Sequence, residues 1–150
     1  MIAYKAKAAV AASVLALAAM AAPAAAQTVS GGTSGGTPQT GDVSASTCGQ
    51  GSTDGSGVAV SGCADAQARN GGTADTSVQA KANERMARQR SVATASDADE
   101  RARSRTQTMV RQGEVVRSRT QSIYHQRGQK PVIQRSTTTS TPQGSSTTPH

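Results

Sequence analysis

The chain has very little of what usually builds a protein core. Its 150 residues include no Phe, no Trp and two Tyr, of which only Tyr124 follows the alanine-rich N-terminal leader. No Leu follows the leader either. Ordering one residue costs about 1.5 kcal/mol, whereas burying a Val or Ile side chain recovers about 1.5–3 kcal/mol. The composition therefore predicts a mostly disordered, low-complexity chain without a globular core.

Residues that carry catalysis or bind metals are equally scarce. The mature histidines are His125 and His150, and neither stands near the two cysteines in the sequence. Ser and Thr are abundant, but a nucleophile needs a rigidly held base and an orienting group beside it. We therefore predict no catalytic residue, no cofactor and no metal site, and an enzyme ranks third among the function classes.

The first 26 residues have the three parts of a secretory signal peptide. Lys5 and Lys7 precede an apolar run over 8–22, and small residues end at a predicted cleavage site between Ala26 and Gln27. The alternative, a membrane anchor, is disfavoured because the run is short, alanine-rich and closed by Pro23. The leader predicts export to the periplasm or the exterior, with no integral membrane segment after cleavage. Its alanine-rich composition is typical of bacteria.

Region 27–74 is rich in Gly, Ser and Thr and holds both cysteines. In an oxidising compartment Cys48 and Cys63 are expected to form one disulfide, with free thiols or an intermolecular bridge as alternatives. The turn signal at 54–57 predicts a two-residue loop in which paired positions sum to 111, so that Cys48 lies opposite Cys63. The sequence thus allows a small disulfide-closed β-hairpin over 48–63.

Region 75–135 is basic, with thirteen Lys/Arg against six Asp/Glu. A capping box at Thr76–Gln79 and the acidic cluster Asp97, Asp99 and Glu100 both resemble helix starts, which predicts α-helical segments at about 76–92 and 97–126. Region 136–150 contains no Lys, Arg, Asp or Glu. We predict a disordered Ser/Thr/Pro tail there.

An internal repeat lies within the basic region. The octapeptide at 103–110 recurs at 117–124, an offset of two heptads. On a helix this spacing would place one apolar stripe on a single face, made of Ala102, Met109, Val116 and Ile123. Three interpretations remain: a local duplication in a fraying helix, weak self-association through the stripe, or docking of the stripe in a partner's groove.

The repeat also duplicates two pairs of arginines. A guanidinium group can form bidentate hydrogen bonds with a phosphate or a carboxylate. The four arginines of the repeat are therefore candidates for polyanion binding: Arg103, Arg105, Arg117 and Arg119. No aromatic residues are interleaved for base stacking, so binding would be electrostatic, salt-sensitive and nonspecific. The alternative is a solvated charged segment that maintains solubility.

Taken together, these features predict an exported, non-enzymatic structural or interaction protein of the cell envelope. Its basic helix would order on an unidentified envelope partner or on a second copy of itself. The alternative function is a cationic protein that binds envelope polysaccharide, anionic lipid or nucleic acid through the arginine-rich repeat.

Overall fold

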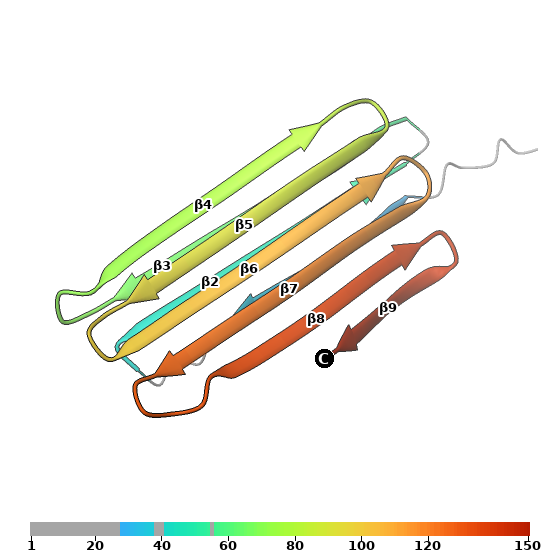
Figure 1. Cartoon of the computed structure of the whole chain (residues 1–150). Helices are drawn as coiled ribbons and strands as arrows, with labels where there is room; N and C mark the ends of the chain where they lie inside the picture. Colours follow the sequence, from blue (N-terminus) through green and yellow to red (C-terminus); the bar gives the residue numbers. More distant parts are fainter. Residues whose placement is uncertain (1–27, 38–40, 55) are drawn as a thin grey trace, which may run out of the picture.

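Two antiparallel β-sheets packed face to face form the protein. The computed structural model describes residues 28–37, 41–54 and 56–150. The smaller sheet has the order β1-β2-β3 and the larger has the order β4-β5-β6-β7-β8-β9, so within each sheet the strands lie side by side in sequence order (Figure 1). The strands are β1 (Val29–Gly36), β2 (Val43–Thr53), β3 (Val58–Ala68), β4 (Thr73–Ala82), β5 (Met86–Ser96), β6 (Glu100–Arg111), β7 (Val115–Gln126), β8 (Val132–Thr141) and β9 (Gly144–Pro149).

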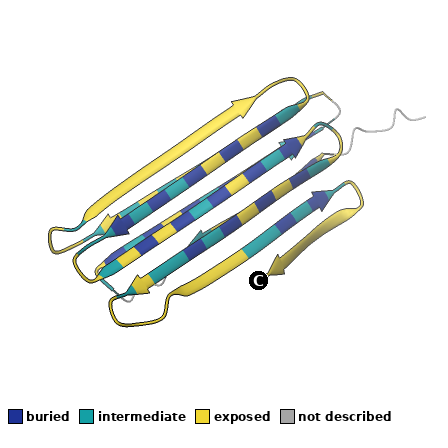
Figure 2. Ribbon diagram, viewed as in Figure 1, coloured by how far each residue is buried: buried dark blue, intermediate teal, exposed yellow. Residues whose placement is uncertain are grey.

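The smaller sheet covers the middle of the larger one. β3 lies against β5, β2 against β6, and β1 against β7 and β8. Along β5, β6 and β7, buried residues alternate with half-buried or exposed ones, whereas β4 and β9 are exposed along their whole length (Figure 2). This pattern is that of a sandwich whose larger layer extends beyond the smaller one at both edges.

The hairpin between β2 and β3 has the register that the sequence predicts. Cys48 lies directly opposite Cys63 with their Cα atoms 4.9 Å apart, and the two residues form the expected disulfide. At the turn, the Asp54 N–H donates to the Gly57 carbonyl at 3.2 Å. Gly55, which the sequence pattern assigns to this loop, lies outside the described residues. The disulfide is consistent with folding in an oxidising compartment.

The predicted helices are wrong, because β4 to β7 occupy the segments 76–92 and 97–126. The capping box at Thr76–Gln79 lies within β4, and the acidic cluster at 97–100 forms the turn into β6. Region 136–150 is also not a disordered tail, since it forms most of β8 and all of β9. The even-numbered residues over 102–110 of β6 and 116–122 of β7 are Ala, Ser, Thr and Val and point inward, and this period of two outweighs the helical signals.

The heptad stripe does not exist as one surface. A spacing of seven residues is odd, and successive side chains of a strand point to opposite faces of its sheet. Ala102 and Val116 are therefore buried between the sheets, whereas Met109 and Ile123 lie on the outer face of the larger sheet. Self-association or groove docking through a helical stripe is excluded by this arrangement.

The core is apolar at both ends and polar in the middle. One end contains a cluster of buried Val and Ala residues with the half-buried Tyr124, and the other contains a second such cluster around Val110 and Val116. Between them lies a network of buried hydroxyls that bond to one another both between the two sheets and within the larger sheet. Thr47 Oγ1 is 2.8 Å from both Ser104 Oγ and Thr106 Oγ1, and Thr106 Oγ1 is 2.8 Å from Thr120 Oγ1.

Glycines on the smaller sheet let the two layers approach closely. A Cβ added at Gly49 would lie 2.7 Å from both Gln89 Oε1 and Thr106 Cγ2, which is too close for a real contact. The expectation of no globular core is therefore wrong. The interior is built from small residues, hydrogen-bonded hydroxyls and close backbone approach, none of which requires large apolar side chains.

Candidate functional site

Strand alternation sorts the charges of the larger sheet onto one side. On β6, the buried inward positions from 102 to 110 are Ala, Ser, Thr and Val, whereas the outward positions include Arg101, Arg103, Arg105 and Arg111. Because paired residues of neighbouring strands lie on the same face, β4, β5, β7 and β8 also place their strand cations on the outer face of the sheet. The outer face of the larger sheet is consequently the most basic surface of the described chain.

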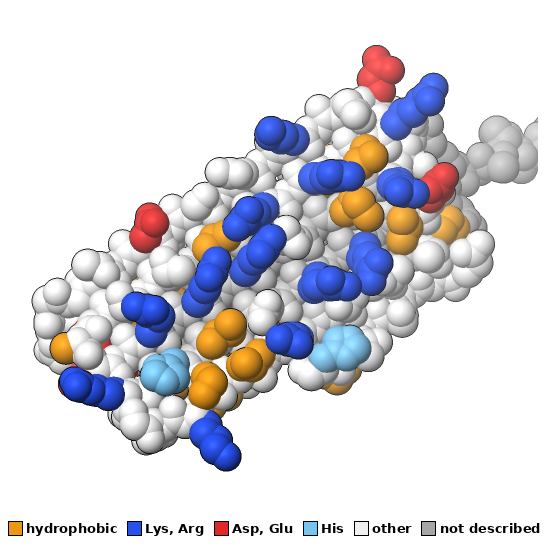
Figure 3. Space-filling model, viewed as in Figure 1, with side chains coloured by type: hydrophobic (Ala, Val, Ile, Leu, Met, Phe, Trp, Pro, Cys, Tyr) orange, Lys and Arg blue, Asp and Glu red, His pale blue; other side chains and the backbone are white. Residues whose placement is uncertain are grey.

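We call this surface the cationic face. Figure 3 views it directly, with blue Lys and Arg side chains spread across the sheet and a few Asp and Glu side chains at its margins. Four other cations of the described chain lie in loops between strands, at Arg69, Arg85, Arg127 and Lys130. The cationic face comprises Lys81, Arg88, Arg90, Arg101, Arg103, Arg105, Arg111, Arg117, Arg119 and Arg135.

These cations have almost no acidic partners. Asp75 on the edge strand β4 is the one outward-facing carboxylate among the strand residues of the described larger sheet. Within the described ranges, the ion pair that forms is Arg127 with Asp99 at 3.5 Å, and it lies at an exposed turn away from the face. The guanidinium groups of the face are thus left to interact with solvent or with a ligand.

Arg105 occupies a central place on this face. Its Nε atom is buried and has no hydrogen-bond partner among the described residues. Burial, followed by the positive charges of Arg90 and Arg103, lowers the pKa of its guanidinium. Burial and the two neighbouring arginines all disfavour the positive charge of Arg105, and an anion bound on the face would offset the repulsion from Arg90 and Arg103.

The four arginines that the sequence singled out share the cationic face. Arg103 pairs with Ile123 and Arg105 with Gln121, while Arg117 pairs with Met109 and Arg119 with Gln107. The two copies of the repeat therefore form one hairpin. Sequence reasoning missed the contributions of β4, β5 and β8, namely Lys81, Arg88, Arg90 and Arg135, although the i, i+2 spacing of Arg88 and Arg90 was a signal for a strand.

Part of the cationic face is hollowed. A depression of about 440 Å³ lies over β6 between the basic side chains of β5 and β7. Gln107 and Met109 of β6 lie among its lining residues, and five cations line it as well: Lys81, Arg88, Arg90, Arg117 and Arg119. We call this depression the β6 hollow.

The opposite outer face of the protein differs in character. A broader depression of about 590 Å³ lies on the smaller sheet and is lined by Ser, Gly, Thr, Gln, Ala and Val residues together with Cys48. No charged side chain lines it within the described residues. Charge is therefore concentrated on one broad side of the sandwich.

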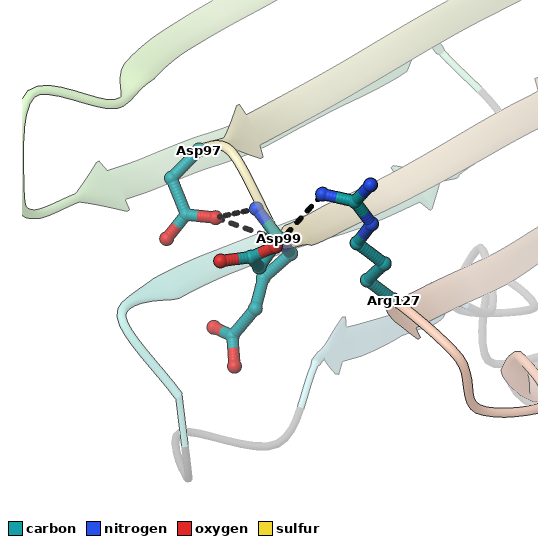
Figure 4. A network of polar contacts seen from close by, with 4 residues as sticks. Asp97, Asp99 and Arg127 are labelled. Carbon is teal, nitrogen blue, oxygen red and sulfur yellow. Dashed lines mark hydrogen bonds and ion pairs between the residues drawn. The ribbon is translucent and has the colours of Figure 1, made fainter.

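The acidic cluster at 97–100 is a structural turn. Asp97 Oδ1 accepts the N–H groups of Asp99 and Glu100 at 2.9 and 2.7 Å, and Asp99 pairs with Arg127 (Figure 4). Glu100 accepts the backbone N–H of Asp42 at 2.8 Å. The three carboxylates thus have separate partners, and no group of three ligand residues suited to a metal is found in the described part of the chain.

The two histidines of the sequence lie apart from each other. His125 is on β7 opposite Arg101, and His150 exchanges backbone hydrogen bonds with Arg135 at 2.9 and 3.3 Å. The predicted cleavage site at Ala26 and Gln27 lies outside the described residues. Within residues 28–37, 41–54 and 56–150, no helix is long and apolar enough to cross a bilayer.

Comparison of the chain with protein-family models, with curated proteins and with solved structures found no match.

Proposed function

We propose that this chain is an exported, non-enzymatic protein that binds polyanions through the cationic face, in the periplasm or outside the cell. The observation that carries the proposal is the gathering of ten Lys and Arg side chains on one sheet face without ion-pair partners among the described residues. Such a surface attracts an anionic polymer over its whole area. A solvated face that only maintains solubility would need no such segregation.

The layout of the face favours an extended ligand. Neighbouring strands are about 4.8 Å apart and successive outward residues about 7 Å apart, so the guanidinium groups form a shallow lattice. Each guanidinium can donate two parallel hydrogen bonds to a phosphate, sulfate or carboxylate. The face carries no Phe, Trp or Tyr side chain for base stacking, which makes an anionic polysaccharide or a lipid surface a better candidate than single-stranded nucleic acid.

The proposal is tested by binding of the oxidised mature chain, Gln27–His150, to dextran sulfate over a series of salt concentrations. The quadruple variant R103Q/R105Q/R117Q/R119Q removes four charges from the cationic face. We expect its affinity to fall at least tenfold and its salt dependence to become shallower, because fewer counterions are released on binding.

The matched control removes four charges from the loops, in the variant R69Q/R85Q/R127Q/K130Q. It has the same net charge as the face variant, and we expect its affinity to stay within about threefold of the wild type, since screening weakens charges away from the contact. Equal losses in both variants would show that net charge alone attracts the polymer. That result, or no binding at physiological salt, would refute the proposal.

A further inference from the structure

The β6 hollow arises because the outward side of β6 has no cation between Arg105 and Arg111. The outward residues Arg101, Arg103 and Arg105 are followed on the same face by Gln107 and Met109. On the flanking strands β5 and β7, by contrast, cations lie directly beside this neutral stretch of β6. The result is an uncharged floor with basic walls.

Register places the walls as two facing pairs. Met109 lies between Arg88 of β5 and Arg117 of β7, and Gln107 lies between Arg90 of β5 and Arg119 of β7. The two walls are two strand spacings apart, about 10 Å, and the two arginines on each wall are about 7 Å apart. Lys81 of β4 stands behind Arg88 and adds a fifth charge to one wall.

This arrangement suits a compact ligand with several negative charges. Five cations line the hollow and no carboxylate does, within the described residues. A group with one negative charge could satisfy one wall, whereas two phosphates, each close to −2, could satisfy both. The volume of about 440 Å³ is within the range of small-molecule sites and exceeds the need of a bare phosphate.

The floor indicates what lies between the two phosphates. Gln107 offers an amide that can donate to or accept from a hydroxyl, and Met109 offers a flexible apolar surface. A sugar ring presents hydroxyls at its edge and C–H groups on its faces, which matches both residues. A pyrophosphate without a ring would leave this floor unused.

We propose that the β6 hollow is a subsite for a single sugar unit that carries two phosphate groups, one bound at each arginine wall. The proposal rests on the proposed function, because it assigns a preferred unit to the polyanion that the cationic face binds. Such a sugar can belong to a phosphorylated polysaccharide or to the headgroup of a glycolipid.

The test is calorimetric titration of the oxidised mature chain with glucose 1,6-bisphosphate. We expect one ligand per chain, with at least tenfold weaker binding of glucose 6-phosphate and of inorganic phosphate. The variant R90Q/R119Q, which removes one arginine from each wall, should weaken bisphosphate binding at least tenfold. The matched variant R69Q/K130Q removes two charges from loops outside the cationic face and should change bisphosphate binding less than threefold.

A second variant, Q107E, tests the subsite independently in case R90Q/R119Q does not fold. It places a negative charge on the floor at an exposed position, and we expect a comparable loss of bisphosphate binding. Equal effects of R90Q/R119Q and R69Q/K130Q, or a lack of one-to-one binding, would overturn the subsite. If the subsite failed but dextran sulfate still bound the wild type, the proposed function would stand without the subsite. If dextran sulfate did not bind the wild type, the proposed function itself would be refuted.

Two further arms distinguish the sources of the sugar. Vesicles that contain a glycolipid with a bisphosphorylated sugar headgroup are compared with a soluble polysaccharide that carries the same sugar unit. Binding of the vesicles with sensitivity to R90Q/R119Q supports a membrane source, and binding of the polysaccharide with this sensitivity supports a polymer source. Insensitivity of both to R90Q/R119Q would contradict the subsite.

Discussion

Single glycines determine how closely the two sheets approach. Gly49 lies on the inward side of β2, where an added Cβ would meet Thr106 Cγ2 and Gln89 Oε1 at 2.7 Å. Gly57, in the adjacent turn, has open space around it, since a Cβ added there would have no neighbour within 4 Å, and its backbone is not left-handed. The two positions therefore separate crowding between the sheets from the general effect of replacing glycine.

We predict that Gly49→Ala lowers the free energy of unfolding by about 1–3 kcal/mol, the usual cost of overpacking a closely packed interior. Gly57→Ala should change it by less than about 0.5 kcal/mol. Urea denaturation of both variants measures the difference. Equal stability of the two variants would contradict the close packing at Gly49.

Tyr124 provides a spectroscopic probe of one end of the core. Burial, and then its hydrogen bond to Glu100, raise the pKa of its phenol from 10.0 to about 12. Because the folded-state pKa is raised, the stabilisation from the neutral phenol is complete below pH 10 and is lost as the pH rises through 12. Tyr124 is the sole tyrosine of the fragment Gln27–His150, so the absorbance of this fragment reports this ionisation alone.

We predict that absorbance titration of the folded mature chain shows phenol ionisation well above pH 10. The variant Tyr124→Phe should lose the part of the alkaline destabilisation that falls between pH 10 and 12. A midpoint near the ordinary value of 10.0 in the folded chain would show that Tyr124 is not held in the half-buried site beside Glu100.

At the scale of the element, the β2–β3 hairpin was predictable and the other strands were not. A compact turn signal and two cysteines at symmetric positions fixed the register of this hairpin. In β6 and β7, the inward residues are mainly Ser, Thr and Ala, which produce no apolar periodicity in the sequence. The alternation of Arg with these small residues was the informative signal, and the acidic turn signals were consistent with both a helix start and a β-turn.

The disulfide contributes to the stability of the smaller sheet. It joins β2 and β3 across 15 residues on the outer face of this sheet. In the chain-entropy model, closing a loop of this length stabilises the folded state by about 3 kcal/mol. We predict that the variant Cys48→Ser/Cys63→Ser loses about this amount in urea denaturation. The reduced wild type should show the same loss, and an unchanged stability in both would contradict a stabilising role.

For the whole molecule, the composition wrongly predicted a disordered chain, because that prediction rests on the number of large apolar residues. The interior is made instead of Ala, Val, Gly and hydroxyl side chains that satisfy one another's hydrogen bonds. The candidate site could be predicted in part from the sequence, since the repeat identified Arg103, Arg105, Arg117 and Arg119. The β6 hollow was not, because it depends on the register of three strands, and that register brings Arg88 and Arg90 beside residues far away in sequence.

A preformed sandwich and a helix that orders on binding make opposite predictions for the whole chain. We predict that far-UV circular dichroism of the oxidised mature chain shows a β-sheet spectrum that is the same at every dilution and unfolds cooperatively. Saturating dextran sulfate should leave this spectrum unchanged, because the cationic face is already in place on the folded sheet. Helical signal that grows with protein concentration or with the polyanion would contradict the fold, and would favour a basic segment that becomes ordered only on its partner.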